Sequence, residues 1–129
     1  MSLLIDTHVL IWLRREPHRL SRRVTVLIQE NKQDIFVSAI SAWEIGIKVH
    51  AGKLDFSKSF LDTFDASLRN NGFEPLAITA QHAATGAQLP GSHKDPFDRL
   101  LAGQAKVEGL TLVSADPAFK NLGINTLWE

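Results

Sequence analysis

Short apolar segments of strand length alternate along this chain with longer segments of helical periodicity. The strand-like segments are residues 3–5, 35–37, 73–78, 110–113 and 124–128. Alternation of this kind favours right-handed βαβ crossovers, in which parallel strands form a sheet and helices cover both of its faces. The sequence therefore predicts a three-layer α/β/α fold with a mostly parallel five-stranded central sheet.

Helices are expected between these strands. The predicted helical segments follow the first strand as far as residue 13, begin at the N-cap Ser21, run from 41 towards 51–52, include the apolar stripe of 60–68, and cover 79–89 and 95–108. No internal repeat, low-complexity tract or Gly/Ser-rich linker interrupts them. We therefore expect a single domain over residues 1–129.

Composition narrows the chemistry that the chain can perform. Cysteine is absent, which excludes disulfides, thiolate catalysis and metal sites of the thiolate type. The apolar N-terminal stretch has no basic region before it and ends at Arg14 and Arg15, too short to span a membrane. These features predict a cytoplasmic protein with no membrane segment.

The formal net charge is zero, which argues against binding nucleic acid by bulk electrostatics alone. The charges are nevertheless uneven, because five arginines lie within ten residues, namely Arg14, Arg15, Arg19, Arg22 and Arg23. Such a cluster suits contacts with phosphates, a solvated helix face or a partner surface. The sequence leaves these three alternatives open.

The first strand segment leads straight into an aspartate within the apolar run LLIDTHVLIWL, residues 3–13. A lone buried carboxylate costs several kcal/mol unless a partner stabilises it. Asp116 follows the fourth strand segment after only Ser114 and Ala115. Because ligands of open parallel sheets bind beyond the carboxyl ends of the strands, Asp6 and Asp116 should reach the same edge of the sheet.

Two more acids should lie near that edge, since Glu44 in SAWEIG and Asp98 in HKDPFDRLLAGQA are both expected in first helical turns. Each acid also has a structural explanation as a helix cap. The expected caps are Asp6, a capping box of Ser41 with Glu44, Asp95 before Pro96 with Asp98 in the first turn, and Asp116 before Pro117.

The four acids together suggest more than capping, because Ser, Thr or Asn would cap these helices as well. Several anions in one cleft repel one another and raise their pKa values unless a cation balances them. Ligands that are all oxygen, without cysteine or an HxxxH pair, favour a hard ion, Mg²⁺ or Mn²⁺. Such an ion activates water and binds phosphate oxygens, so the pattern predicts a metal-dependent phosphodiesterase.

Four motifs, in this order and spacing, resemble those of a PIN-domain ribonuclease, and within that superfamily a VapC-type toxin of a toxin–antitoxin pair: LLIDTHVLIWL, SAISAWEIGIKVHAGKL, HKDPFDRLLAGQA and TLVSAD. The resemblance extends from Leu3 to Trp128. It implies that four carboxylates are catalytic and bind Mg²⁺ or Mn²⁺: Asp6, Glu44, Asp98 and Asp116.

The resemblance also marks supporting residues. Thr7 belongs to the D-T motif, and Ser114 matches a hydroxyl position beside the metal site. His8 stands where many members have asparagine, which leaves open whether it contacts substrate, contacts the metal's waters or forms local hydrogen bonds. Asp95 is expected to be mainly a helix cap, and Arg99 to meet a phosphate or a neighbouring acid.

The activity implied by the resemblance is endonucleolytic hydrolysis of single-stranded RNA by a metal-activated water. The implied partners are a VapB-like antitoxin, whose C-terminal segment lies across the helices near the acidic cleft, and a second copy of the chain in a homodimer. Two alternatives remain. A receiver-type signalling domain also has an acidic Mg²⁺ pocket, but it needs adjacent acids where this chain has Asp6-Thr7. An inactive PIN-fold protein would only bind a partner.

Overall fold

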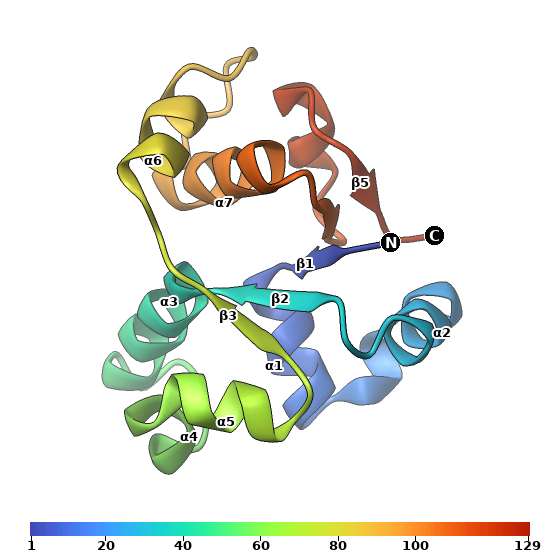
Figure 1. The fold of residues 1–129 in the computed structure, drawn as a ribbon. Coiled ribbons are helices and arrows are strands. Elements are labelled where there is room, and N and C mark those ends of the chain that lie inside the picture. Colours follow the sequence, from blue (N-terminus) through green and yellow to red (C-terminus); the bar gives the residue numbers. More distant parts are fainter.

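The computed structural model describes residues 1–129 and contains a five-stranded sheet with helices on both faces (Figure 1). The strands are β1 (Leu3–Ile5), β2 (Ile35–Ser38), β3 (Glu74–Leu76), β4 (Thr111–Val113) and β5 (Thr126–Leu127). Their order in the sheet is β3-β2-β1-β4-β5, and every neighbouring pair is parallel. The predicted α/β fold is confirmed, with a sheet that is entirely parallel.

The helices are α1 (Thr7–Arg15), η1 (Pro17–Arg19), α2 (Arg22–Glu30), α3 (Ala39–His50), α4 (Lys58–Asp62), α5 (Phe64–Asn70), α6 (Ala80–Ala87), α7 (Pro96–Glu108) and η2 (Pro117–Leu122). None of them has the length and apolar character that crossing a bilayer requires. Helices α6 and α7 lie on one side of the sheet, and α1, α4 and α5 lie on the other (Figure 1).

Each face of the sheet has its own apolar core. The larger core packs Leu3 and Ile5 of β1 against α1, α2, α4 and α5, with Phe60 and Leu68 among its buried members. The smaller core packs Leu4 of β1 and Leu112 of β4 against α7 and η2. Alternate residues of β1 therefore point to opposite cores, as the two-residue period of a strand requires.

The strand register places three polar residues side by side at the carboxyl edge of the sheet. Ile5 pairs with Val37 of β2 and with Val113 of β4. The residue after each of these three is polar and almost fully buried: Asp6, Ser38 and Ser114. Buried polar groups need hydrogen-bond partners, so this row is where the fold must supply them.

Helix α3 begins earlier than the sequence suggested. Its N-cap is Ser38, whose Oγ accepts from the backbone N–H of Ile40 at 3.0 Å. The expected capping box of Ser41 and Glu44 is therefore wrong, because the chain turns helical directly at the end of β2. Ser41 and Glu44 lie inside the helix, and their side chains are free to bond elsewhere.

The apolar stripe of residues 60–68 forms two short helices rather than one. The break is at Thr63, which has non-helical backbone angles (φ −125°, ψ 46°). Its hydroxyl and its backbone N–H both donate to the carbonyl of Ser59 in α4, at 2.8 and 3.2 Å. The helical period continues across this break, so the periodicity alone could not locate it.

Helices α6 and α7 touch backbone to backbone through two glycines. A Cβ on Gly103 would lie 2.4 Å from the carbonyl oxygen of His82, and one on Gly86 would lie 2.3 Å from that of Arg99. No side chain fits such a gap. Gly103, unfavourable inside a helix on propensity grounds, is thus explained by the close approach of α6.

Candidate active site

Asp6 lies at the end of β1 and is 5% exposed. Its Oδ1 accepts from the backbone N–H of Thr7 at 2.7 Å, and its Oδ2 accepts from Ser114 Oγ at 2.7 Å. The ring nitrogen Nδ1 of His8 lies 3.3 Å from Oδ2. These donors explain how the apolar run of the first strand can end in a carboxylate, and they confirm that Asp6 caps α1.

Thr7 joins Asp6 to Glu44. While its backbone N–H binds Asp6, its Oγ1 donates to Glu44 Oε1 at 2.9 Å and lies 2.9 Å from Ser41 Oγ. A hydroxyl has one proton, so Ser41 is the donor in the second contact. The side chains of Ser41 and Glu44, one turn apart on α3, thus meet the first turn of α1.

Asp98 lies in the first turn of α7, and its side chain is 18% exposed. Its Oδ2 lies 2.8 Å from His93 Nε2 in the preceding loop. Asp95 is the N-cap of α7 and accepts from the N–H groups of Phe97 and Asp98 through Oδ1, at 2.9 and 3.2 Å. Asp95 therefore serves as the helix cap that the sequence predicted.

Arg99 is occupied by backbone carbonyls of the segment between α6 and α7. Its guanidinium donates to the carbonyls of His93, Gly86, Leu89 and Gly91. No acid is among these partners, and four of the five N–H donors of the side chain are used within the chain. A contact with a phosphate stays a prediction. Arg99 instead holds the loop that carries His93 towards Asp98.

Asp116 is exposed and caps η2, with Oδ1 accepting from the N–H of Ala118 at 2.9 Å. Its own backbone N–H donates to Ser114 Oγ at 3.1 Å. Because Ser114 Oγ in turn donates to Asp6, this hydroxyl links the ends of β1 and β4.

His8 forms local hydrogen bonds. Its Nε2 accepts from the N–H of Ala115 at 3.1 Å. Burial lowers the pKa of His8, although the nearby charges of Asp6 and Asp116 act in the opposite direction. A neutral ring that accepts through Nε2 carries its proton on Nδ1, which faces Asp6. The His8 ring thus bonds to the backbone of Ala115 and lies 3.3 Å from Asp6, which agrees with local hydrogen bonding, one of the alternatives that the sequence left open.

The acids repel one another. Burial raises the pKa of Glu44, and the charges of Asp6 and Asp98 raise it further, while the bond from Thr7 opposes the shift. Burial also raises the pKa of Asp98, and Asp95 and Asp6 add to the effect, opposed by the bond to His93. The structure thus brings Asp6, Glu44 and Asp98 within range of each other's charge, at the sheet edge predicted from the sequence.

The donor set suits a hard divalent cation in its chemistry, since it consists of carboxylate oxygens whose mutual repulsion a cation would relieve. In the present side-chain conformations, no three Asp, Glu or His residues form a group that could hold a metal ion. Each carboxylate instead faces a donor of the protein, namely Thr7 and Ser114 for Asp6, Thr7 for Glu44, His93 for Asp98 and Ala118 for Asp116.

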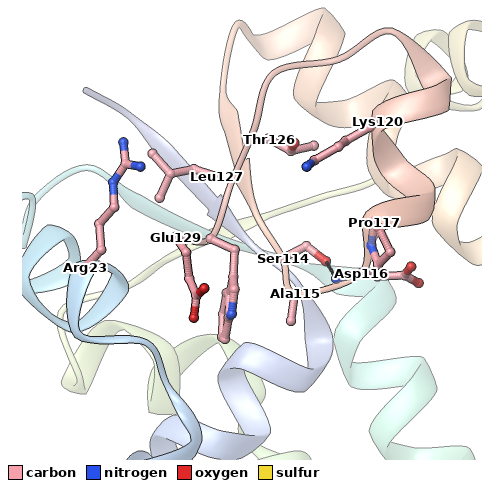
Figure 2. Close-up of a pocket in the computed structure, with 10 residues that line it drawn as sticks. Arg23, Ser114, Ala115, Asp116, Pro117, Lys120, Thr126, Leu127 and Glu129 are labelled. Carbon is pink, nitrogen blue, oxygen red and sulfur yellow. Dashed lines mark hydrogen bonds between the residues drawn. The ribbon is translucent and has the colours of Figure 1, made fainter.

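A cavity of about 330 Å³ opens beside Asp116; Asp6, Glu44 and Asp98 do not line it (Figure 2). Ser114 and Asp116 belong to its wall, so it is continuous with the row of polar residues at the sheet edge. Lys120 of η2 also lines it, although no motif in the sequence connects this residue with the site.

Ser41, expected to cap a helix, contacts Thr7 instead. His93, which lies 2.8 Å from Asp98, belongs to none of the motif positions named from the sequence.

Comparison with known proteins places these observations in a family. The PIN domain family model matches residues 3–125. Ribonuclease VapC22 of Mycobacterium tuberculosis is 33% identical to this chain in an alignment 119 residues long, which covers 89% of this chain and 87% of that protein.

Solved structures agree on the fold. The structure of DNA-bound VapBC from Salmonella typhimurium includes a chain that matches with a TM-score of 0.73 and 18% identity, covering 98% of this chain and 97% of that one. A toxin–antitoxin complex from Klebsiella pneumoniae matches with a TM-score of 0.58 and 19% identity, covering 89% of this chain and 87% of that one.

Proposed function

Because the chain belongs to the PIN-domain family, we propose that it is a VapC-type ribonuclease, the toxin of a toxin–antitoxin pair. The reaction is endonucleolytic hydrolysis of phosphodiester bonds in single-stranded RNA, and it depends on Mg²⁺ or Mn²⁺. The proposal rests first on the proximity of three acids at the sheet edge. Burial raises the pKa values of Glu44 and Asp98, the charges of Asp6 and Asp98 raise that of Glu44 further, and the charge of Asp6 adds to that of Asp98.

A divalent ion bound there would act as a Lewis acid and would lower the pKa of water. Asp6, Glu44 and Asp98 would hold it, and Asp116 at the rim would complete the site directly or through water. The other residues act on these ligands. Thr7 orients Asp6 through its backbone N–H and Glu44 through its hydroxyl. Ser114, which follows β4, donates to Asp6.

Two histidines have distinct positions in this scheme. His8 accepts from the backbone N–H of Ala115 through Nε2, and its Nδ1 lies 3.3 Å from Asp6 Oδ2, so its ring lies against that carboxylate. His93 lies against Asp98 and is held by the loop that Arg99 binds. Partners of this kind typically affect metal affinity or activity by about 10–100-fold.

The partners that we propose are a VapB-like antitoxin and a second copy of the chain, acting in the cytoplasm. The similarity to a chain of a toxin–antitoxin complex supports the first. The face of α3 that exposes Trp43 and Ile47 flanks Glu44 and offers apolar surface for a protein partner.

The family match and an activity assay distinguish the proposed ribonuclease from the two alternatives, a receiver-type signalling domain and an inactive PIN-fold protein. The match to the PIN domain over residues 3–125 leaves no support for a receiver-type signalling domain. An inactive relative that only binds a partner differs from the proposed enzyme in one measurement, which is RNA cleavage by the isolated chain.

The test is cleavage of single-stranded RNA by protein freed of any antitoxin. We expect cleavage with Mg²⁺ or Mn²⁺, its loss with a chelator, and its return when the ion is restored. Metal binding followed by calorimetry provides a second readout that does not depend on turnover. Undiminished cleavage in chelator, or no cleavage with either ion, would contradict the proposal.

A further inference from the structure

The cavity beside Asp116 has features that the acid cluster does not explain. Its wall is formed by residues 114–116 after β4, by β5 and the residues after it, by Arg23 of α2, and by Pro117 and Lys120 of η2 (Figure 2). Its volume of about 330 Å³ lies within the range of sites for small ligands. It starts at Ser114 and Asp116, so a group bound in it would extend directly from the proposed metal site.

Two cations flank this cavity and neither is neutralised within the chain. Arg23 and Lys120 lie on opposite sides of it (Figure 2). Both are exposed, and neither takes part in an ion pair. Arg15 and Arg19, from the same basic cluster, do form ion pairs, with Asp55 and Glu16. Arg23 is thus an arginine of that cluster whose charge is available to a ligand.

The same cavity has an aromatic residue in its wall. Trp128 lines it and packs edge-on against Trp12, with ring centroids 5.8 Å apart. The ring of His8, whose Nδ1 lies 3.3 Å from Asp6 Oδ2, is 4.8 Å from that of Trp12 and 6.2 Å from that of Trp128. An aromatic cluster therefore leads from the acids to the cavity, with cations at its sides.

We propose that this cavity binds the nucleotide next to the scissile phosphate of a single-stranded RNA, with flanking phosphates against Arg23 and Lys120 and the base against Trp128. The inference deepens the proposed function and rests on it. Aromatic side chains bordered by cations are the usual means of holding single-stranded RNA, because stacking accepts any base and the cations follow the backbone. An acidic peptide would use the cations but would leave the aromatic wall without a role.

Glu129 also lines the cavity and bears a charge that opposes a phosphate. Replacing Glu129 by glutamine, its neutral isostere, should therefore strengthen the binding of RNA. Asp116, the other acid in the wall, belongs to the proposed metal site, where an ion would offset its charge.

The test measures RNA affinity separately from cleavage. A short fluorescent single-stranded RNA of mixed sequence is titrated with Asp6→Asn protein in Mg²⁺, and the anisotropy is followed at several salt concentrations. On that background, Arg23→Ala with Lys120→Ala should weaken binding roughly tenfold. The salt slope should fall by about 0.7 for each phosphate that the protein no longer neutralises. Glu129→Gln should tighten binding.

The matched control is Arg22→Ala with Lys32→Ala, which removes the same charge from exposed positions outside the cavity. It should leave the affinity within about twofold and lower the salt slope by less than about 0.7. The four proteins should share one melting temperature, since none of the side chains replaced on the Asp6→Asn background is buried.

A photo-crosslink gives the position of the base. RNA that carries 5-iodouridine next to the cleavage site should crosslink to the peptide that contains Trp128. If wild-type protein cleaves RNA but the cavity pair behaves like its control, or the crosslink falls elsewhere, this inference is wrong and the proposed function stands. If the protein neither cleaves nor binds RNA, both fail.

Discussion

Asp6 and Asp116 occupy similar places in the chain and very different places in the molecule. Each follows a strand, β1 or β4, and each caps the next helix. The two strands are neighbours with Ile5 opposite Val113, so Asp6 is opposite Ser114 and Asp116 lies two residues beyond. Asp6 is buried, accepts from Thr7 and Ser114 and lies 3.3 Å from His8 Nδ1, whereas Asp116 is exposed and its carboxylate binds one backbone N–H.

Distance from the strand end thus determines what a capping carboxylate can do. A capping carboxylate directly after the strand is buried at the carboxyl edge of the sheet. Removing its charge from water is costly there, so it needs several hydrogen-bond partners. A cap two residues later reaches the rim, where solvent screens it. We infer that Asp6 is the central ligand and that Asp116 modulates the site.

Asp6→Asn tests the buried acid directly after β1 and should have the largest effect. We expect RNA cleavage to fall by more than about a hundredfold, because even the partners of metal ligands are worth about 10–100-fold. The melting temperature should be unchanged or higher, since the amide still accepts from Thr7 and the repulsion with Glu44 and Asp98 is gone. Loss of folding, or full activity, would show that Asp6 is only structural.

Ser114→Ala tests the link between the two strand ends. The substitution removes the donor to Asp6 Oδ2 and the acceptor of the Asp116 N–H. We expect a loss of about 1–3 kcal/mol in the free energy of unfolding, measured with denaturant, because a buried carboxylate loses a charge-assisted bond. Cleavage should fall roughly tenfold. Ser59→Ala, at an exposed site, is the control, and an equal effect there would remove the link.

Asp116→Asn tests the rim. Asparagine caps a helix as well as aspartate does, so the free energy of unfolding should change by less than about 0.5 kcal/mol. The concentration of Mg²⁺ needed for half-maximal cleavage should rise, because one negative charge near the ion is lost. An effect on cleavage as large as that of Asp6→Asn would contradict the assignment of Asp6 as the central ligand.

The pH dependence of stability should be the smallest of these effects. Glu44 and Asp98 have pKa values raised above 4.5 and 3.8, so the folded protein binds more protons than the unfolded chain in the range between the unfolded and folded values. The stability of metal-free protein should therefore fall as the pH rises from those values through the higher folded values. Glu44→Gln should flatten the fall, and a stability that rises over the same range would contradict the shifts.

The residues at the strand ends were predictable from the sequence, but the start of the helix that follows β2 was not. The positions of Asp6, Ser114 and Asp116 relative to apolar runs placed them at one edge, because parallel strands in a sheet end together. The choice between Ser38 and Ser41 as the cap of α3 was not determined locally, since both are serines near the start of the same helix. Only the end of β2 decided it.

Long-range contacts account for the remaining differences. Arg99 was expected near an acid because Asp98 adjoins it, yet its fork binds carbonyls brought together by the packing of α6 on α7. That packing depends on Gly86 and Gly103, which are far apart in the chain and whose contact no local pattern encodes.

The order of apolar runs and the identity of the residue after each run are properties of the chain itself, and they determined the parallel sheet, the edge and the four acids. Burial, partners and the state of each acid were decided by the folded structure, because charge and hydrogen-bond energies depend on what surrounds a group in space rather than along the sequence. Thus Asp6 and Asp116, alike as strand-end caps, differ in environment through the register of β1 and β4.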